Sequence, residues 1–255
     1  ENYVITTTPV TEISDAQLIP TMGNTQKRTQ VIYYDGLGRP LQEIAHRQGP
    51  SFEDMIQIYE YDMHGREVKK HLPYGGASPS LNFRTNAFTE QKDFYQKKAR
   101  VSHTQYPFSE AQFEESPFDR VLEQGSAGVD WQVGGETIEI SYEVNGPSEV
   151  RLWVMNSGQW VSNSFYASGE LYRHITRDEH GMKTVVYNDK ESRTVLRKQQ
   201  FGSNPERFTE TYYVYDDLGL LRCVIPPQAY ADMISYNVNI EVPDRVYLYN
   251  YDERD

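Results

Sequence analysis

The chain has 255 residues and a formal net charge of −12, from 37 acidic and 25 basic residues. This balance argues against nucleic acids and anionic membrane surfaces as partners, because both require a basic footprint. Its single cysteine, Cys223, excludes an internal disulfide framework, and no apolar run approaches the ~18 residues that a membrane-spanning helix needs.

Two β-hairpins are predicted first, between residues 31 and 73. The runs Val31–Tyr34 and Ile56–Tyr61 alternate large apolar or aromatic residues with other residues, which is typical of strands. Each run ends in the phrase Tyr-Asp-x-x-Gly-Arg. An Asp in this position hydrogen-bonds the backbone two residues further on, and the Gly adopts the left-handed conformation that closes a bulged hairpin.

The Arg that follows the Gly in the best copies has two structural roles open to it. It forms an ion pair with the Asp, or it lies across a Tyr ring of the neighbouring repeat as a cation–π contact.

A short helix is expected after a Pro/Gly/Ser cluster at residues 73–79. Phe88, Gln91, Phe94 and Tyr95 recur at roughly helical spacing, and lysines end the segment, as suits a helix C-terminus. We expect this helix near residues 86–98, with Asn86 as its N-cap and with an edge or open end of the sheet beneath it.

Three segments are predicted along the chain. Residues 1–128 hold the first hairpin repeats and the short helix. Residues 129–174 are a β-rich block, either a sandwich-like insertion or further strands of the same ribbon, with Asn145-Gly146 as a turn signal. Residues 175–255 resume the hairpin repeats and end within one.

Weaker copies of the phrase continue the pattern in the last segment. Because a catalytic residue is normally needed once, recurrence favours turn formation and packing between strands over catalysis. The residues of the repeated phrase are Tyr34, Asp35, Gly38, Arg39, Tyr61, Asp62, Gly65, Arg66, Asp178, Gly181, Asp189, Arg193, Tyr215, Asp216, Gly219, Tyr251 and Asp252.

These phrases resemble the YD repeat of the RHS (rearrangement hotspot) family. Residues 33–43, around Tyr34-Asp35, resemble the N-terminal module of the large RHS-repeat proteins of Bacteroidetes. Residues 116–125 resemble a degenerate repeat of the same kind, in which Ser116-Pro117 replaces the Tyr-Asp start.

The resemblance implies a fold and a role. The fold is mainly β, with consecutive antiparallel hairpins of the YD-repeat type that form a curved sheet or partial β-shell, and one short helix. The role is that of a non-catalytic scaffold segment in a large exported or cell-surface protein. Its partners are then later repeats of the same polypeptide and a C-terminal, toxin-like domain that the shell encloses or displays.

The main alternative is a surface carbohydrate-binding module that uses Trp131, Trp153 or Trp160, since sugar sites often place a flat aromatic ring beside polar groups. The other explanation for these three Trp residues is that their side chains fill the core. A glycoside hydrolase is less favoured, because no local context distinguishes a pair of carboxylates.

No catalytic residue, metal ligand or cofactor site is assigned from the sequence. The six histidines lack close zinc-site spacing. Cys223 lies in the apolar run of residues 220–225 and is predicted to be a small buried packing residue.

Overall fold

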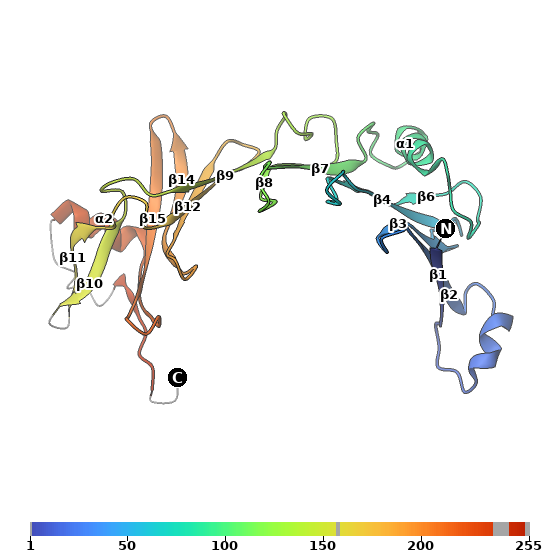
Figure 1. Ribbon diagram of the computed structural model, residues 1–255, viewed down its shortest axis with the longest axis horizontal. Helices are drawn as coiled ribbons and strands as arrows, with labels where there is room; N and C mark the ends of the chain where they lie inside the picture. The colour runs from blue at the N-terminus through green and yellow to red at the C-terminus, as the bar shows by residue number, and fades with distance from the viewer. Residues whose placement is uncertain (1, 157–158, 237–244, 253–255) are drawn as a thin grey trace. The chain divides into compact units, whose positions relative to one another are not determined.

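The computed structural model describes residues 2–156, 159–236 and 245–252 (Figure 1). The chain divides into two compact units, Glu1–Thr137 and Ile138–Asp255. In each unit the strands form an antiparallel sheet that stays open, and helices are few. The predicted fold class is therefore confirmed, whereas the three-segment division of the sequence stays a prediction.

The first unit contains one sheet with the strand order β1-β2-β3-β4-β5-β7-β8, and β6 pairs separately with β4. Neighbouring strands are also neighbours along the chain, apart from the excursion through β6 and α1. The elements are β1 (Asn2–Pro9), a 3-10 helix η1 (Ala16–Thr21), β2 (Lys27–Tyr34), β3 (Pro40–His46), β4 (Met55–Glu60), β5 (Lys69–His71), β6 (Tyr74–Gly75), α1 (Ala87–Lys97), β7 (Phe108–Phe113) and β8 (Val121–Gly125).

The second unit contains a sheet with the order β9-β12-β13-β14-β15-β16-β17 and a separate hairpin of β10 and β11. The β10–β11 hairpin lies in the long connection between β9 and β12. The elements are β9 (Ile138–Val144), β10 (Arg151–Asn156), β11 (Gln159–Phe165), β12 (Tyr172–Arg177), β13 (Lys183–Asn188), β14 (Thr194–Ser203), β15 (Glu206–Tyr215), β16 (Leu221–Ile225), α2 (Pro227–Tyr236) and β17 (Tyr247–Leu248).

Each unit buries one face of its sheet. In the first unit the buried side chains alternate along each strand, as with Val31 and Tyr33 on β2, and they pack against the connection after β6 and against α1. In the second unit the sheet packs against the β10–β11 hairpin and α2. Cys223 is fully buried in this core, as predicted, and burial raises the pKa of its thiol to about 11.

The predicted helix is α1. Asn86 occupies its N-cap position, but the Asn86 side chain makes no capping hydrogen bond. The helix is instead fixed by Gln91, which is buried and donates to the carbonyl oxygen of Leu72 at 2.5 Å while its own oxygen lies 2.9 Å from Nδ1 of His71. The second helix, α2, was not predicted; it begins at Pro227, a residue favoured in the first turn of helices.

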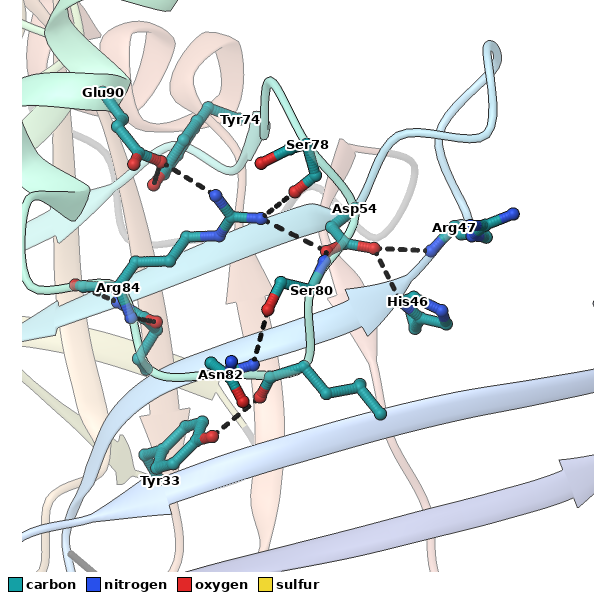
Figure 2. A network of polar contacts seen from close by, with 12 residues as sticks. Tyr33, His46, Arg47, Asp54, Tyr74, Ser78, Ser80, Asn82, Arg84 and Glu90 are labelled. Carbon is teal, nitrogen blue, oxygen red and sulfur yellow. Dashed lines mark hydrogen bonds and ion pairs between the residues drawn. The ribbon is translucent and has the colours of Figure 1, made fainter.

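A buried polar network attaches the segment between β6 and α1 to the sheet (Figure 2). Asp54 is completely buried and accepts the backbone N–H groups of Arg47 at 2.9 Å and of Ser80 at 2.5 Å. His46 lies 2.9 Å from the same carboxylate, and an Nη atom of Arg84 lies 3.2 Å from it. A buried carboxylate is stable only when its oxygens are paired in this way.

Arg84 connects this network to the helix. Its guanidinium also bonds the carbonyl oxygen of Ser78 at 2.6 Å and lies 3.3 Å from the carboxylate of Glu90 on α1. The backbone of Arg84 exchanges two hydrogen bonds with the buried side chain of Gln42 on β3. These contacts attach the segment between β6 and α1 to the sheet and so complete the core of the first unit.

Replacement of Asp54 by Ala is expected to destabilise the first unit by about 3–5 kcal/mol, because it removes the buried carboxylate that pairs with Arg84 and accepts the backbone N–H groups of Arg47 and Ser80. Urea unfolding followed by circular dichroism measures the loss. Asp93→Ala is the matched control, since Asp93 pairs with Lys97 on the exposed face of α1 and the expected loss there is below about 1 kcal/mol. Equal losses in the two variants would contradict the assignment.

Candidate functional site

The repeated turns carry the same hydrogen-bond pattern. At the first turn, Oδ1 of Asp35 accepts the backbone N–H groups of Leu37 at 2.8 Å and of Arg39 at 2.9 Å, and Oδ2 accepts Nε of Arg39 at 2.7 Å. One carboxylate thus closes the turn and holds the guanidinium. The turns at Asp62 and Asp189 repeat all three bonds, with Arg66 and Arg193 as the donors of the charged one.

The backbone explains the Gly and the bulge. The amide of Gly38 donates to the carbonyl oxygen of Asp35, and Gly38 has a φ of 80°; Gly65, Gly181 and Gly219 have values between 79° and 84°. These are left-handed conformations in which any Cβ is strained. In the β2–β3 pairing the register shifts between Tyr33 and Tyr34, immediately before the turn, as in a bulged hairpin.

Each Arg also reaches the next hairpin. The guanidinium carbon of Arg39 lies 4.6 Å from the ring centroid of Tyr61, and that of Arg66 lies 4.7 Å from the ring of Phe113. In the second unit Arg193 covers Tyr215 at 5.1 Å, and Arg222 covers the ring of Tyr251 at 5.0 Å. The sequence left an ion pair and a cation–π contact as alternatives, and the geometry shows both at once.

The strand register accounts for this contact. Gln42 on β3 is opposite Ile58 on β4, and continuing that register by three residues places Arg39 opposite Tyr61. The β14–β15 register, with Leu196 opposite Tyr212, places Arg193 opposite Tyr215 in the same way. We call this arrangement an arginine link. It consists of the turn carboxylate, its Arg, and the aromatic ring at the corresponding position of the neighbouring strand.

The Gly of a following turn makes room for the link. A β-carbon built on Gly65 would lie 2.8 Å from Nη1 of Arg39, and one built on Gly219 would lie 2.8 Å from Nη1 of Arg193. Gly38, in the first turn, has no atom within 4 Å of the same position. Gly65 and Gly219 therefore satisfy two constraints, a positive φ and a neighbouring guanidinium, while Gly38 satisfies one.

The link lowers the pKa values of Asp35 and Asp62. The backbone N–H of Arg39 is the largest influence on Asp35, and with the Arg39 guanidinium it lowers the pKa of that carboxyl. At Asp62 partial burial raises the pKa, but the hydrogen bonds from the backbone and guanidinium of Arg66 outweigh it, so the net pKa is lowered. Both shifts follow from hydrogen bonds that favour the charged form.

Some copies depart from the pattern. Met182 replaces the Arg after Gly181, so the Asp178 turn keeps its two backbone bonds without a guanidinium. At the Asp189 turn, Ser192 takes the Gly position with a φ of 65°. At the last complete turn the charged bond to Asp216 comes from Arg222 rather than from the residue after the Gly.

The turn between β7 and β8 contains a carboxylate–Arg pair that sequence reasoning missed. Glu114 accepts both Nε and Nη2 of Arg120, at 2.8 and 2.7 Å, and Oγ of Ser116 donates to it at 2.6 Å. These bonds, led by that of Arg120, lower the pKa of Glu114 to about 2. Phe113 and Glu114 occupy the place of Tyr-Asp, so the signal was an aromatic–acidic pair two residues upstream of Ser116.

The three tryptophans do not form one site. Trp131 is a partly exposed residue of the first unit, whereas Trp160 is buried in the core of the second. Trp153 packs edge-to-face against Tyr212 and Tyr230 and lines a cavity of about 240 Å³, but its indole N–H is buried and has no hydrogen-bond acceptor within the described residues. No two of these rings are brought together as a sugar platform by the described contacts.

The fold and the repeated links define the class of protein. It is a hairpin-repeat protein, in which the turn of one hairpin contacts the next hairpin along the sheet. The sequence profile of the family described as "Domain of unknown function (DUF6443)" matches residues 5–144. The chain therefore belongs to the DUF6443 family. No curated protein shows significant sequence similarity to it.

Solved structures share the fold. The crystal structure of TcdB2-TccC3-TEV is 16% identical in sequence, with a TM-score of 0.51, and the match covers 84% of this chain and 10% of that one. The crystal structure of TcdB2-TccC3 without hypervariable C-terminal region is 15% identical, with a TM-score of 0.53, and the match covers 83% and 9%. The chain thus spans about a tenth of the length of these proteins, and the likeness is one of fold.

Among the described residues, no helix is both long and apolar enough to span a bilayer.

The two constraints on glycine give a test. Gly38→Ala is expected to lower the free energy of unfolding by about 1–2 kcal/mol, the cost of a left-handed backbone with a Cβ. Gly65→Ala is expected to cost about 0.5–1 kcal/mol more, because it also displaces the guanidinium of Arg39 from Tyr61. Adding Arg39→Ala should remove this excess in Gly65→Ala. Equal costs for the two single variants would contradict the second constraint.

Acid should weaken the Glu114 turn. A carboxylate with a depressed native pKa contributes stability that is present above its ordinary value of 4.5 and is lost as the pH falls toward about 2. Unfolding free energies measured across this window should fall less steeply in Glu114→Gln than in the native chain. Glu115→Gln removes the same charge from the exposed neighbouring residue and should leave the slope unchanged; an unchanged slope in Glu114→Gln would refute the assignment.

Proposed function

We propose that this chain is a non-catalytic scaffold segment of a larger exported RHS-like protein. It contributes strands to a shell that encloses or displays a C-terminal, toxin-like domain. Its partners in this proposal are other repeats of the same polypeptide and that C-terminal domain. The attribution to a Bacteroidetes RHS-repeat protein, at the cell surface or secreted, belongs to the same proposal.

The observation that carries the proposal is the arginine link. It recurs in both units with the same atoms, and each copy joins one hairpin to the next. Repetition of one contact at successive hairpins suits a wall, because each added hairpin is held by the one before it. The repeated geometry uses both carboxylate oxygens and the guanidinium in contacts within the sheet, so these groups have a structural role.

The likeness in fold to TcdB2-TccC3 supports a segment of a larger assembly, since the matched region is a small fraction of those chains. The net charge of −12 agrees with a wall that repels nucleic acids and anionic membranes.

Limited proteolysis of the full-length protein tests the enclosing role. If the shell encloses the C-terminal region, that region should resist protease in the native protein. The double variant Arg39→Gln/Arg66→Gln should expose it at a protease concentration that leaves the native protein intact, because it loosens two successive hairpins of the wall.

A matched variant, Lys97→Gln, removes a cation from the exposed face of α1 and should preserve protection. A C-terminal region that is cleaved as readily in the native protein as in the double variant would contradict enclosure. Protection that survives in the double variant would contradict the role of the links.

A further inference from the structure

The first unit contains a cavity that the scaffold role does not explain. Its volume is about 560 Å³, within the ~300–1,000 Å³ range of small-molecule sites. One wall is the loop with Ser51 and Glu53, the floor is the backbone from Tyr74 to Ala77, and the other wall is the α1 face with Glu90, Asp93 and Phe94. Lys97 and Lys98 also line the cavity.

The walls are held by contacts independent of any ligand. Tyr74 is completely buried and donates its hydroxyl hydrogen to Glu90 at 3.0 Å, and Glu90 also bonds Arg84 of the buried network (Figure 2). Glu53 accepts the backbone N–H of Ser51 at 2.7 Å. The cavity therefore does not depend on a ligand for its shape.

Glycine at position 75 keeps the floor close to both walls. A β-carbon there would lie 3.0 Å from Cγ of Glu53 and 3.2 Å from the ring of Phe94. Gly75 has no positive φ, so its backbone conformation does not require glycine. The small residue instead allows a carboxylate and an aromatic ring to approach the same stretch of backbone.

The charges of the lining select the ligand class. Three carboxylates line the cavity, those of Glu53, Glu90 and Asp93. They would repel phosphate and other anionic ligands, so such ligands are disfavoured. A free cation is disfavoured as well, because the chain already supplies cations: Lys97 pairs with Asp93 at 2.9 Å, and Nζ of Lys98 lies 5.9 Å from the ring centroid of Phe94. Acceptors and donors are thus both present, with little net charge left to neutralise.

We propose that this cavity binds one or two rings of a neutral glycan. Sugar hydroxyls donate to the carboxylates of Glu53 and Asp93 and accept from the ammonium group of a lysine, and an apolar sugar face covers the ring of Phe94. This places carbohydrate recognition at α1 and β6, away from Trp131, Trp153 and Trp160. The inference is independent of the scaffold role, since a wall segment can also carry a glycan site.

Titration of the 255-residue chain with neutral sugars tests the proposal. The probes are the methyl glycosides of glucose, galactose and mannose, N-acetylglucosamine, and their disaccharides, followed by saturation-transfer NMR and calorimetry. At least one is expected to bind saturably. Glu53→Gln and Asp93→Asn, which keep side-chain shape, should each weaken that binding by roughly ten-fold, the loss of about one good hydrogen bond.

Melting temperature separates binding from folding. Both substitutions lie on partly or fully exposed side chains, so the melting temperature should stay near that of the native chain. Glu115→Gln, outside the cavity, should leave affinity unchanged. The proposal is overturned if no sugar of the panel binds, if affinity survives both cavity substitutions, or if inorganic phosphate, choline or free glycine binds at this cavity in place of the sugars.

Discussion

The structure depends on a carboxylate that does two things at once. In the linked turns, the Asp accepts backbone N–H groups with one oxygen, which fixes the hairpin, and holds an Arg with the other, which fixes the guanidinium over an aromatic ring on the next strand. Exposed ion pairs and cation–π contacts are individually weak, about 0.5–1 kcal/mol each. They matter here because they are repeated and share atoms. They also add side-chain contacts between neighbouring hairpins that would otherwise be joined only by backbone hydrogen bonds.

The two units share the linked hairpins but cover one face of their sheets with different elements. In the first, a connection pinned by Asp54 and Arg84 and the helix α1 bury one sheet face, and in the second the β10–β11 hairpin and α2 do so. The covers bury the apolar face, while the arginine links join successive hairpins. The arginine links and the apolar core thus stabilise the fold in separate ways. The proposed glycan cavity lies at α1 and β6, in the segment that covers the sheet of the first unit.

Much of this fold followed from local patterns. The period-two strands, the Asp-x-x-Gly turns and the helix α1 were predictable because the hydrogen bonds that define them join residues close in sequence. Glu114 was missed although Ser116 and Arg120 lie in the same turn, because a Glu stands where the repeated phrase has Asp. The network around Asp54 was not predictable, since its partners lie in other elements: Arg84 is thirty residues from Asp54. The cavity beside α1 was missed for the same reason, and the tryptophans drew attention because aromatic type is visible in a sequence while burial is not.

The central claim is that an Arg on one hairpin stabilises the fold through the ring of the next. A double-mutant cycle with Arg66→Gln and Phe113→Leu measures this coupling directly, since the cycle cancels the bonds of Arg66 to Asp62 and Asp119. The account predicts a coupling free energy of about 0.5–1 kcal/mol in favour of the native pair. A coupling of zero would show that each hairpin is held by its backbone ladder alone and would contradict the account.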